Sequence, residues 1–376
     1  MNKKLLIAAV GAALVAGPMM AAQAAPTVYG SFHMSLDRYD VDSSATVTTE
    51  RGLVNSNSSR FGIKGDEDLG GGLKSIYQVE GGVFAADDGT SGFGNTLRNT
   101  YLGFTSSSWG TVKLGRHDTP IKDLGRAIDQ FNEQIGDARN ITGNGGTFDA
   151  RVNNMLRYDS ADFGGIRFAL LYNTPEARNT QTISTTASTA SSPSTGTSTG
   201  TLADNVRTMS GNVTFTQGPL YVGLGYEKQM YPSSAKKDAT DMRLVGKYSM
   251  GDLILSALYE TMSDLAGTSG ADRKAWGLGA GFKMANNTLK LQYYTTDKVG
   301  AQTTENGGNI MALGVDHSFS KTTVAYFNYA TASNDGGTTA FNVSSSNGGH
   351  GTTNVPTVGK AGGDGKAYSF GTIIKF

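Results

Sequence analysis

Alternation of apolar and polar residues with a period of two recurs along most of the chain. In the clearest segment, 220–227, Leu, Val, Leu and Tyr alternate with Tyr, Gly, Gly and Glu. Comparable alternation occurs in segments 166–173, 276–283 and 289–293. Because successive side chains on a strand point to opposite sides, each segment predicts a β-strand with one apolar face and one polar face.

The connections between these segments alternate in length. Short links occupy 70–72, 217–219, 250–252, 285–287 and 318–321, whereas long polar links occupy 118–151, 175–205 and 334–365. Short turns at one end and long loops at the other are typical of bacterial outer-membrane barrels, whereas sandwiches rarely separate their loops in this way. The links divide the chain into sixteen strands, from 27–41 to 365–376, with roughly ten residues for each membrane crossing.

These strands can cross a bilayer only as a closed sheet, because every backbone N–H and C=O group in hydrocarbon needs a partner within the protein. The sequence therefore predicts an all-β fold, a transmembrane antiparallel up-and-down β-barrel of about sixteen strands. A ring of that size encloses an aqueous channel rather than a core filled by side chains.

The first 24 residues have the three parts of a secretory signal peptide. Lys3 and Lys4 precede an apolar run at 5–15, and Ala22 and Ala24 provide the small-residue cleavage pattern. We therefore expect cleavage after Ala24 and a barrel domain of residues 25–376. A retained helix is the alternative, but the apolar run is too short for a membrane anchor.

Composition narrows the function further. Cysteine is absent, which excludes disulfides and thiolate metal sites. The chain has 32 basic and 32 acidic residues, so it lacks the basic field that gathers nucleic acid. The Ser/Thr-rich segment 180–201 cannot bury a core and is expected to be an external loop, with a linker between two domains as the alternative.

Residues that could suggest other chemistry have simpler explanations. The histidines, His33, His117, His317 and His350, are too scattered for metal-ligand spacing. His117 and Asp118 could serve a hydrolase with a serine, but no G-x-S-x-G motif is present. The glycines at 277, 279 and 281 lie in an alternating strand and not in a dinucleotide-binding loop. We expect no catalytic residues, no bound metal and no cofactor.

The chain ends in AYSFGTIIKF, which places Tyr368, Phe370 and Phe376 on one face, as expected if that face meets lipid. With the final aromatic residue, four segments resemble the Gram-negative general diffusion porins: SRFGIKGDEDLGGGLKSIYQVEGG at 59–82, YLGFTSSSWGTVKLGR at 101–116, LRYDSADFGG at 156–165 and GVDHSFSKTT at 314–323. The resemblance covers the whole mature chain.

This resemblance implies an outer-membrane channel for passive diffusion of small hydrophilic solutes and ions. It also implies a homotrimer, a third external loop folded into each lumen, and insertion by assembly machinery that recognises the terminal strand through Tyr368, Phe370 and Phe376. Two rivals stay open: a channel specific for a sugar, phosphate or dicarboxylate, and a surface adhesin or receptor that acts through its long loops.

The same resemblance implies a constriction at which acids of loop 118–151 face bases of the barrel wall. The expected acids are Asp118, Asp123, Asp129 and Glu133. The resemblance implies the wall bases Arg60, Arg116 and Arg151, and the alternation adds Lys64.

The alternation supports some of these wall positions better than others. Arg60 and Lys64 have the parity opposite to Ile63 and should point inward, whereas Arg116 shares the parity of Leu114 and needs a bulge to do so. The loop lacks the PEFGG stretch of the enteric porins. The acids of the loop favour a channel that prefers cations, because carboxylates raise the local cation concentration.

Overall fold

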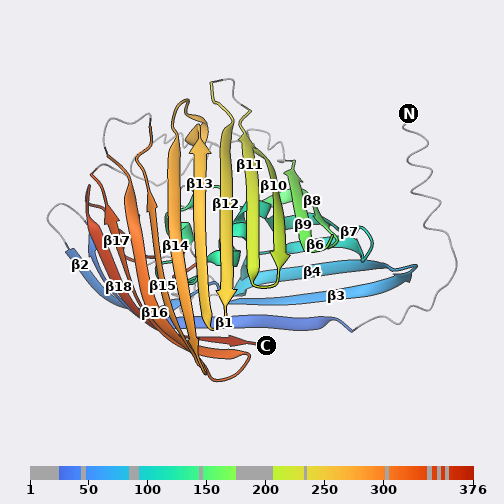
Figure 1. Ribbon diagram of the computed structural model, residues 1–376, viewed down its shortest axis with the longest axis horizontal. Helices are drawn as coiled ribbons and strands as arrows, with labels where there is room; N and C mark the ends of the chain where they lie inside the picture. The colour runs from blue at the N-terminus through green and yellow to red at the C-terminus, as the bar shows by residue number, and fades with distance from the viewer. Residues whose placement is uncertain are drawn as a thin grey trace, which may run out of the picture.

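The computed structural model describes residues 25–43, 48–83, 93–143, 147–174, 206–232, 235–300, 305–336, 341–344, 349–351 and 355–376. In this part of the chain, eighteen strand segments form one antiparallel sheet (Figure 1). They are β1 (Thr27–Asp42), β2 (Thr48–Ser56), β3 (Arg60–Gly70), β4 (Leu73–Val83), β5 (Phe93–Leu97), β6 (Thr100–Ser106), β7 (Gly110–Asp118), β8 (Arg151–Ser160), β9 (Ile166–Asn173), β10 (Arg207–Gln217), β11 (Leu220–Met230), β12 (Ala239–Met250), β13 (Leu253–Ser263), β14 (Arg273–Met284), β15 (Asn287–Thr296), β16 (Gly308–Ser318), β17 (Thr323–Asn334) and β18 (Asp364–Lys375).

The eighteen segments occupy sixteen positions around the barrel. β2 and β3 both pair with β1, one with its second half and the other with its first, so together they form a single interrupted strand. β5 and β6 likewise both pair with β4. The prediction of a sixteen-stranded all-β barrel is confirmed, and the two interruptions are a feature that the sequence pattern did not reveal.

Pairing of the first strand with the last closes the ring. β1 and β18 are aligned from Ser31 opposite Lys375 to Val41 opposite Gly365. At the end of this seam, Gly30 and Phe376 exchange backbone hydrogen bonds of 3.0 and 3.2 Å. No sheet edge is left open along this seam, which satisfies the requirement that the hydrocarbon imposes on backbone groups.

The two faces of the strands have the predicted polarity. On β11, Leu220, Leu224 and Tyr226 are exposed on the outside, while Gly225 and Glu227 are buried on the inside. The outside also carries Tyr368, Phe370 and Phe376 of β18, each roughly half exposed. Exposed apolar side chains of this kind surround the barrel and form the surface that meets lipid.

Short turns and long loops are segregated as predicted. Tight turns join β10 to β11 and β12 to β13, with Gly218 (φ 55°) and Gly251 (φ 58°) in the left-handed region that suits glycine. In Figure 1 these turns lie at the lower end of the upright strands and the longer connections at the upper end. The expected signal peptide at 1–24 and the loop 180–201 lie outside the described residues.

The helices in the described part of the chain are short and lie in the connections. They are α2 (Pro120–Ile128), η1 (Ala138–Asn140) and η2 (Leu265–Gly267). Among the described helices, none is both long and apolar enough to cross a bilayer. The connection 119–150, between β7 and β8, contains α2 and η1 and folds into the barrel, so that its teal ribbon lies behind β10–β14 in Figure 1. We call this connection the inner loop.

Adjacent residues on β10 provide a test of which face meets lipid. Val213 is 53% exposed on the outer face, and Thr214 points to the lumen. We expect Val213→Arg to destabilise the barrel by about 2 to 4 kcal/mol if this position lies near the bilayer mid-plane. Thr214→Arg should change the free energy of unfolding far less. Denaturant titration in lipid vesicles measures both, and equal costs would contradict the assignment of faces.

Candidate functional site

The inner loop is held in the lumen by an apolar side that packs on the barrel wall. Leu124, Ile128, Phe131, Ile135 and Ile141 are buried in one cluster with wall residues. The wall side of this cluster comprises Tyr39, Val41, Val245, Leu258, Tyr294, Ile310, Ala312, Ala330, Ala332 and Ala367. Burial of five large side chains removes enough apolar surface from water to fix the loop in place, at about 1.5 to 3 kcal/mol for each.

Glycines on the wall and on the loop make this close approach possible. A Cβ atom on Gly223 or Gly225 of β11 would lie only 2.5 or 2.7 Å from the Leu124 side chain. A Cβ on Gly136 of the loop would lie 2.4 Å from that of Ala312. The loop therefore rests directly on backbone, and the small inward residues of these strands form its seat.

A buried ionic clamp holds the far end of the inner loop. Arg243 of β12 lies 2.7 Å from Asp149 of the loop and donates to Glu260 of β13 at 2.8 Å. Glu260 also accepts from the backbone N–H of Gly143 at 2.9 Å. Burial opposes ionisation of Asp149, but the charge of Arg243 outweighs it and lowers the pKa of this carboxyl.

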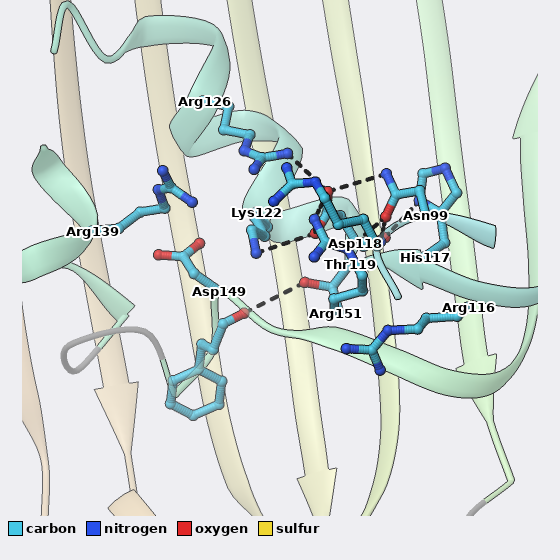
Figure 2. Close-up of polar contacts among 12 residues, drawn as sticks. Asn99, Arg116, His117, Asp118, Thr119, Lys122, Arg126, Arg139, Asp149 and Arg151 are labelled. Carbon is cyan, nitrogen blue, oxygen red and sulfur yellow. Dashed lines mark hydrogen bonds and ion pairs between the residues drawn. The ribbon is translucent and has the colours of Figure 1, made fainter. Parts of the chain in front are cut away.

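On its other side the loop carries charged groups that converge on Asp118, at the end of β7. Figure 2 shows Lys122, Arg126 and Arg151 directed at this carboxylate. Their nitrogens lie 3.1, 2.8 and 3.1 Å from its oxygens. Asn99 donates a further hydrogen bond at 3.2 Å. Asp118 thus gathers bases from the loop and from the wall.

Glu133 of the loop is a second centre. Its carboxylate lies 2.7 Å from Arg60, 3.6 Å from Arg98 and 3.8 Å from Arg126. Burial opposes ionisation of Glu133, but the charges of the three arginines outweigh it and hold the pKa of its carboxyl well below the usual range. Arg98 also donates to Glu80 at 2.7 Å, which links the wall strands to the loop.

We call the five bases around these carboxylates the basic cluster: Arg60, Arg98, Lys122, Arg126 and Arg151. They face three acids, Glu80, Asp118 and Glu133, so the group has a surplus of two positive charges. The acids lie behind the bases: the Asp118 side chain is 1% exposed, whereas those of Arg60 and Arg126 are 24% and 23% exposed. The surface offered to water is therefore mainly guanidinium.

The structure brings four of the expected constriction residues together, namely Arg60, Arg151, Asp118 and Glu133. Lys64 lies two inward positions further along β3, with its ammonium 5.0 Å from the centre of the Tyr29 ring. Arg116 lies beside a register shift between β7 and β8, where a bulge was expected. Its guanidinium donates to the backbone carbonyl of Leu97 and to Asn153, so it is not brought to Asp118.

The other two expected acids have different surroundings. The Asp123 side chain is 37% exposed and pairs with Arg157 of β8 at 2.7 Å. Asp129 accepts hydrogen bonds from the backbone N–H groups of Phe131 and Ala138 and so shapes the loop itself. Acids of the loop therefore do not form one row facing the bases.

Sequence reasoning missed Arg98, because the strand that contains it is interrupted. Leu97 and Leu102 are both exposed on the outer face although they are five residues apart, a spacing that puts side chains on opposite faces of a regular strand. The break between β5 and β6 turns Arg98 inward. A five-residue spacing between lipid-facing leucines is the signal that could have revealed it.

A similar break lies beside Arg60. Val54 and Ile63, nine residues apart, are both exposed outside, so the parity changes between β2 and β3. With the register shift beside Arg116, three neighbouring places on this wall are irregular. Such irregularities often aim side chains at functional sites, and here they direct Arg60 and Arg98 at the loop.

Comparison with known proteins identifies relatives that match most of the chain. A family model described as Gram-negative porin matches residues 7–337. The outer membrane porin protein 32 of Delftia acidovorans is 30% identical over 88% of this chain and 90% of that protein. An outer membrane porin of Bordetella pertussis is 30% identical over 70% of each chain.

Solved structures share the fold. An anion-selective porin from Comamonas acidovorans has a TM-score of 0.70 at 24% identity and covers 94% of this chain and 99% of its own. Salmonella typhi OmpF has a TM-score of 0.64 at 14% identity, with 93% of this chain and 97% of its own covered.

Two glycine positions test the seat of the inner loop. Gly225→Val would push Leu124 away from the wall, whereas Gly246 of β12 has no atom within 4 Å of an added Cβ. We expect Gly225→Val to lower the free energy of unfolding by about 1 to 3 kcal/mol and Gly246→Val to leave it nearly unchanged.

Because the chain has no cysteine, thiol labelling after Ala127→Cys reports directly on displacement of α2. Faster labelling in the Gly225→Val background is the expected result. Identical labelling rates in the Gly225→Val and Gly246→Val backgrounds would contradict the conclusion that the inner loop rests directly on the wall backbone.

Proposed function

The chain belongs to the Gram-negative porin family, whose members form outer-membrane channels for passive diffusion, and we propose that its basic cluster favours small anions over cations. The family and the fold are those of a channel rather than an enzyme. The comparisons favour the diffusion channel over the substrate-specific channel and the adhesin.

The observation that carries the anion preference is the order of charges at the basic cluster. Asp118, Glu133 and Glu80 are nearly covered, while Arg60 and Arg126 present the more exposed guanidinium groups. A permeating ion therefore meets positive charge first. Counting the acids in the loop predicts a preference for cations, and this proposal replaces that prediction. Asp129, one of those acids, accepts hydrogen bonds from backbone N–H groups of the loop.

The arrangement also suits passage rather than retention. An unpaired group of arginines would bind an anion tightly and slow conduction, which needs weak binding. Asp118 and Glu133 each engage two or more of the bases and reduce the surplus charge. Fixed guanidinium groups can then exchange hydrogen bonds with a hydrated anion without holding it.

One structural relative supports the proposal. The porin from Comamonas acidovorans is described as anion-selective. Its identity to this chain is 24%, so the likeness concerns the fold, and the proposed selectivity here rests on the basic cluster.

Assembly belongs to the same proposal. A trimer form is described for OmpT, an outer membrane protein of Vibrio cholerae, and we propose a homotrimer for this chain in the outer membrane. Residues 1–24 would direct export, and the exposed aromatic face of β18, with Tyr368, Phe370 and Phe376, would be recognised by the assembly machinery. The Phe376 ring lies 5.8 Å from that of Phe32, which joins this face to β1.

Ion selectivity in a planar bilayer tests the proposal. In a potassium chloride gradient at low ionic strength, where charges are least screened, the reversal potential should have the sign of a chloride-preferring pore. Arg126→Gln should lower the chloride-to-potassium permeability ratio roughly twofold to fivefold, as expected for one charge about 8 Å or less from the ion path.

Arg167→Gln is the matched control, because Arg167 is an exposed arginine that pairs with Asp162 beside a short turn. This substitution should leave the ratio almost unchanged. A wild-type pore that prefers potassium would overturn the proposal.

Lys122 predicts a pH dependence. Burial lowers the pKa of its ammonium to about 8, against the opposing charge of Asp118. The side chain is charged below pH 8 and loses its proton above it, so the basic cluster loses one positive charge as the pH rises. The chloride-to-potassium ratio should fall roughly twofold between pH 7 and pH 9. Recordings of Lys122→Met should show this dependence abolished; an unchanged pH profile in that variant would assign the titration to another group.

A further inference from the structure

The connection between β17 and β18 also enters the lumen and rests on the inner loop. Its described residues Phe341, Val343 and Val358 are buried in the apolar cluster that holds the inner loop. The carbonyl of Val343 accepts from the backbone N–H of Gly136 at 2.7 Å and from the Asn140 side chain at 3.2 Å. The two connections are therefore packed together as one unit.

His350, in the same connection, is fully buried between the wall and the inner loop. Its Nε2 lies 2.8 Å from Asp37 Oδ2 on β1, and its Nδ1 lies 3.4 Å from the backbone carbonyl oxygen of Glu133. Gly349 (φ 74°) and Gly351 (φ 72°) flank it in the left-handed region. These two glycines let the backbone turn sharply and place the ring at the back of Glu133.

The residues that this segment contacts are themselves strained. Glu133 (φ 62°) and Ser58 (φ 51°) are non-glycine residues in the left-handed region, which costs free energy and persists only where the surroundings enforce it. Ser58 Oγ donates to the Gly349 carbonyl at 3.0 Å. Ser58 lies two residues before Arg60, and Glu133 holds the Arg60 guanidinium.

From this geometry we infer that His350 is a positioning residue for the pore: held by Asp37, its ring packs behind the Glu133 backbone and thereby keeps the Glu133 carboxylate on Arg60 and near Arg98. The inference rests on the proposed function, because Glu133 in turn holds the Arg60 guanidinium, which is the charge that the permeating ion meets. His350 itself lies behind Glu133 and has no exposed surface. Its effect on permeation therefore passes through Glu133.

A double-mutant cycle distinguishes this role from general support of the fold. In the full-length channel, His350→Ala should raise the open-channel noise. It should also change the chloride-to-potassium permeability ratio by about twofold or more, which corresponds to the lower end of the coupling energies between residues in contact. In a Glu133→Gln background the same substitution should have almost no further effect. Equal effects of His350→Ala in both backgrounds would overturn the inference. So would a His350→Ala channel with the noise and permeability ratio of the wild type.

Gly349→Ala provides a second route if His350→Ala does not fold. An added Cβ at this position lies 3.4 Å from Glu133 Cγ and 2.5 Å from Ser58 Oγ, at a backbone conformation that alanine tolerates poorly. Its effect on the permeability ratio should likewise vanish when Glu133 is glutamine. Additive effects of these two substitutions would overturn the inference.

His317→Ala is the matched histidine control, because His317 contacts Asn287 at the opposite, short-turn end of β16. It should leave noise and permeability ratio unchanged. A wild-type channel that does not prefer chloride would refute the proposed function alone, since the coupling between positions 350 and 133 is measured whatever the sign of the selectivity.

Discussion

The antiparallel pairing of β1 with β18 is the interaction on which the rest of the structure depends. Backbone groups in hydrocarbon have no water to pair with, so the sheet must end where it began. The seam from Ser31 and Lys375 to Val41 and Gly365 meets that requirement. Closure creates an interior that strands of this number cannot fill with their own side chains. A separate segment is needed to narrow the interior, and the inner loop supplies it.

The inner loop has two sides with different roles. Its apolar side packs on a wall made smooth by Gly223 and Gly225, and its far end is clamped by Arg243. Its charged side meets the basic wall through Asp118 and Glu133. The apolar contacts provide most of the attachment, because partly exposed ion pairs contribute little net stability. The ion pairs instead set the positions of the guanidinium groups, which is what a permeating ion senses.

The sequence predicted the barrel well because alternation with a period of two is a local signal. The faces of β11, the sixteen strands and the segregation of short turns from long loops all follow from it. The position of Arg98 does not follow from regular alternation, since the break between β5 and β6 shifts the alternation by one residue and only the spacing of Leu97 and Leu102 marks it. The separate surroundings of Asp123 and Asp129 were equally hidden, because the fold of the inner loop decides which carboxylate meets an arginine and which meets a backbone N–H.

The packing of α2 against β9–β13 also makes the lumen wall chemically uneven. On that side α2 covers the wall, whereas Arg60 of β3 and Arg98 beside β5 bring positive charge to another part of the lumen. The charge around a passing solute is therefore asymmetric, and a dipolar molecule would travel with a preferred end turned toward Arg60 and Arg98.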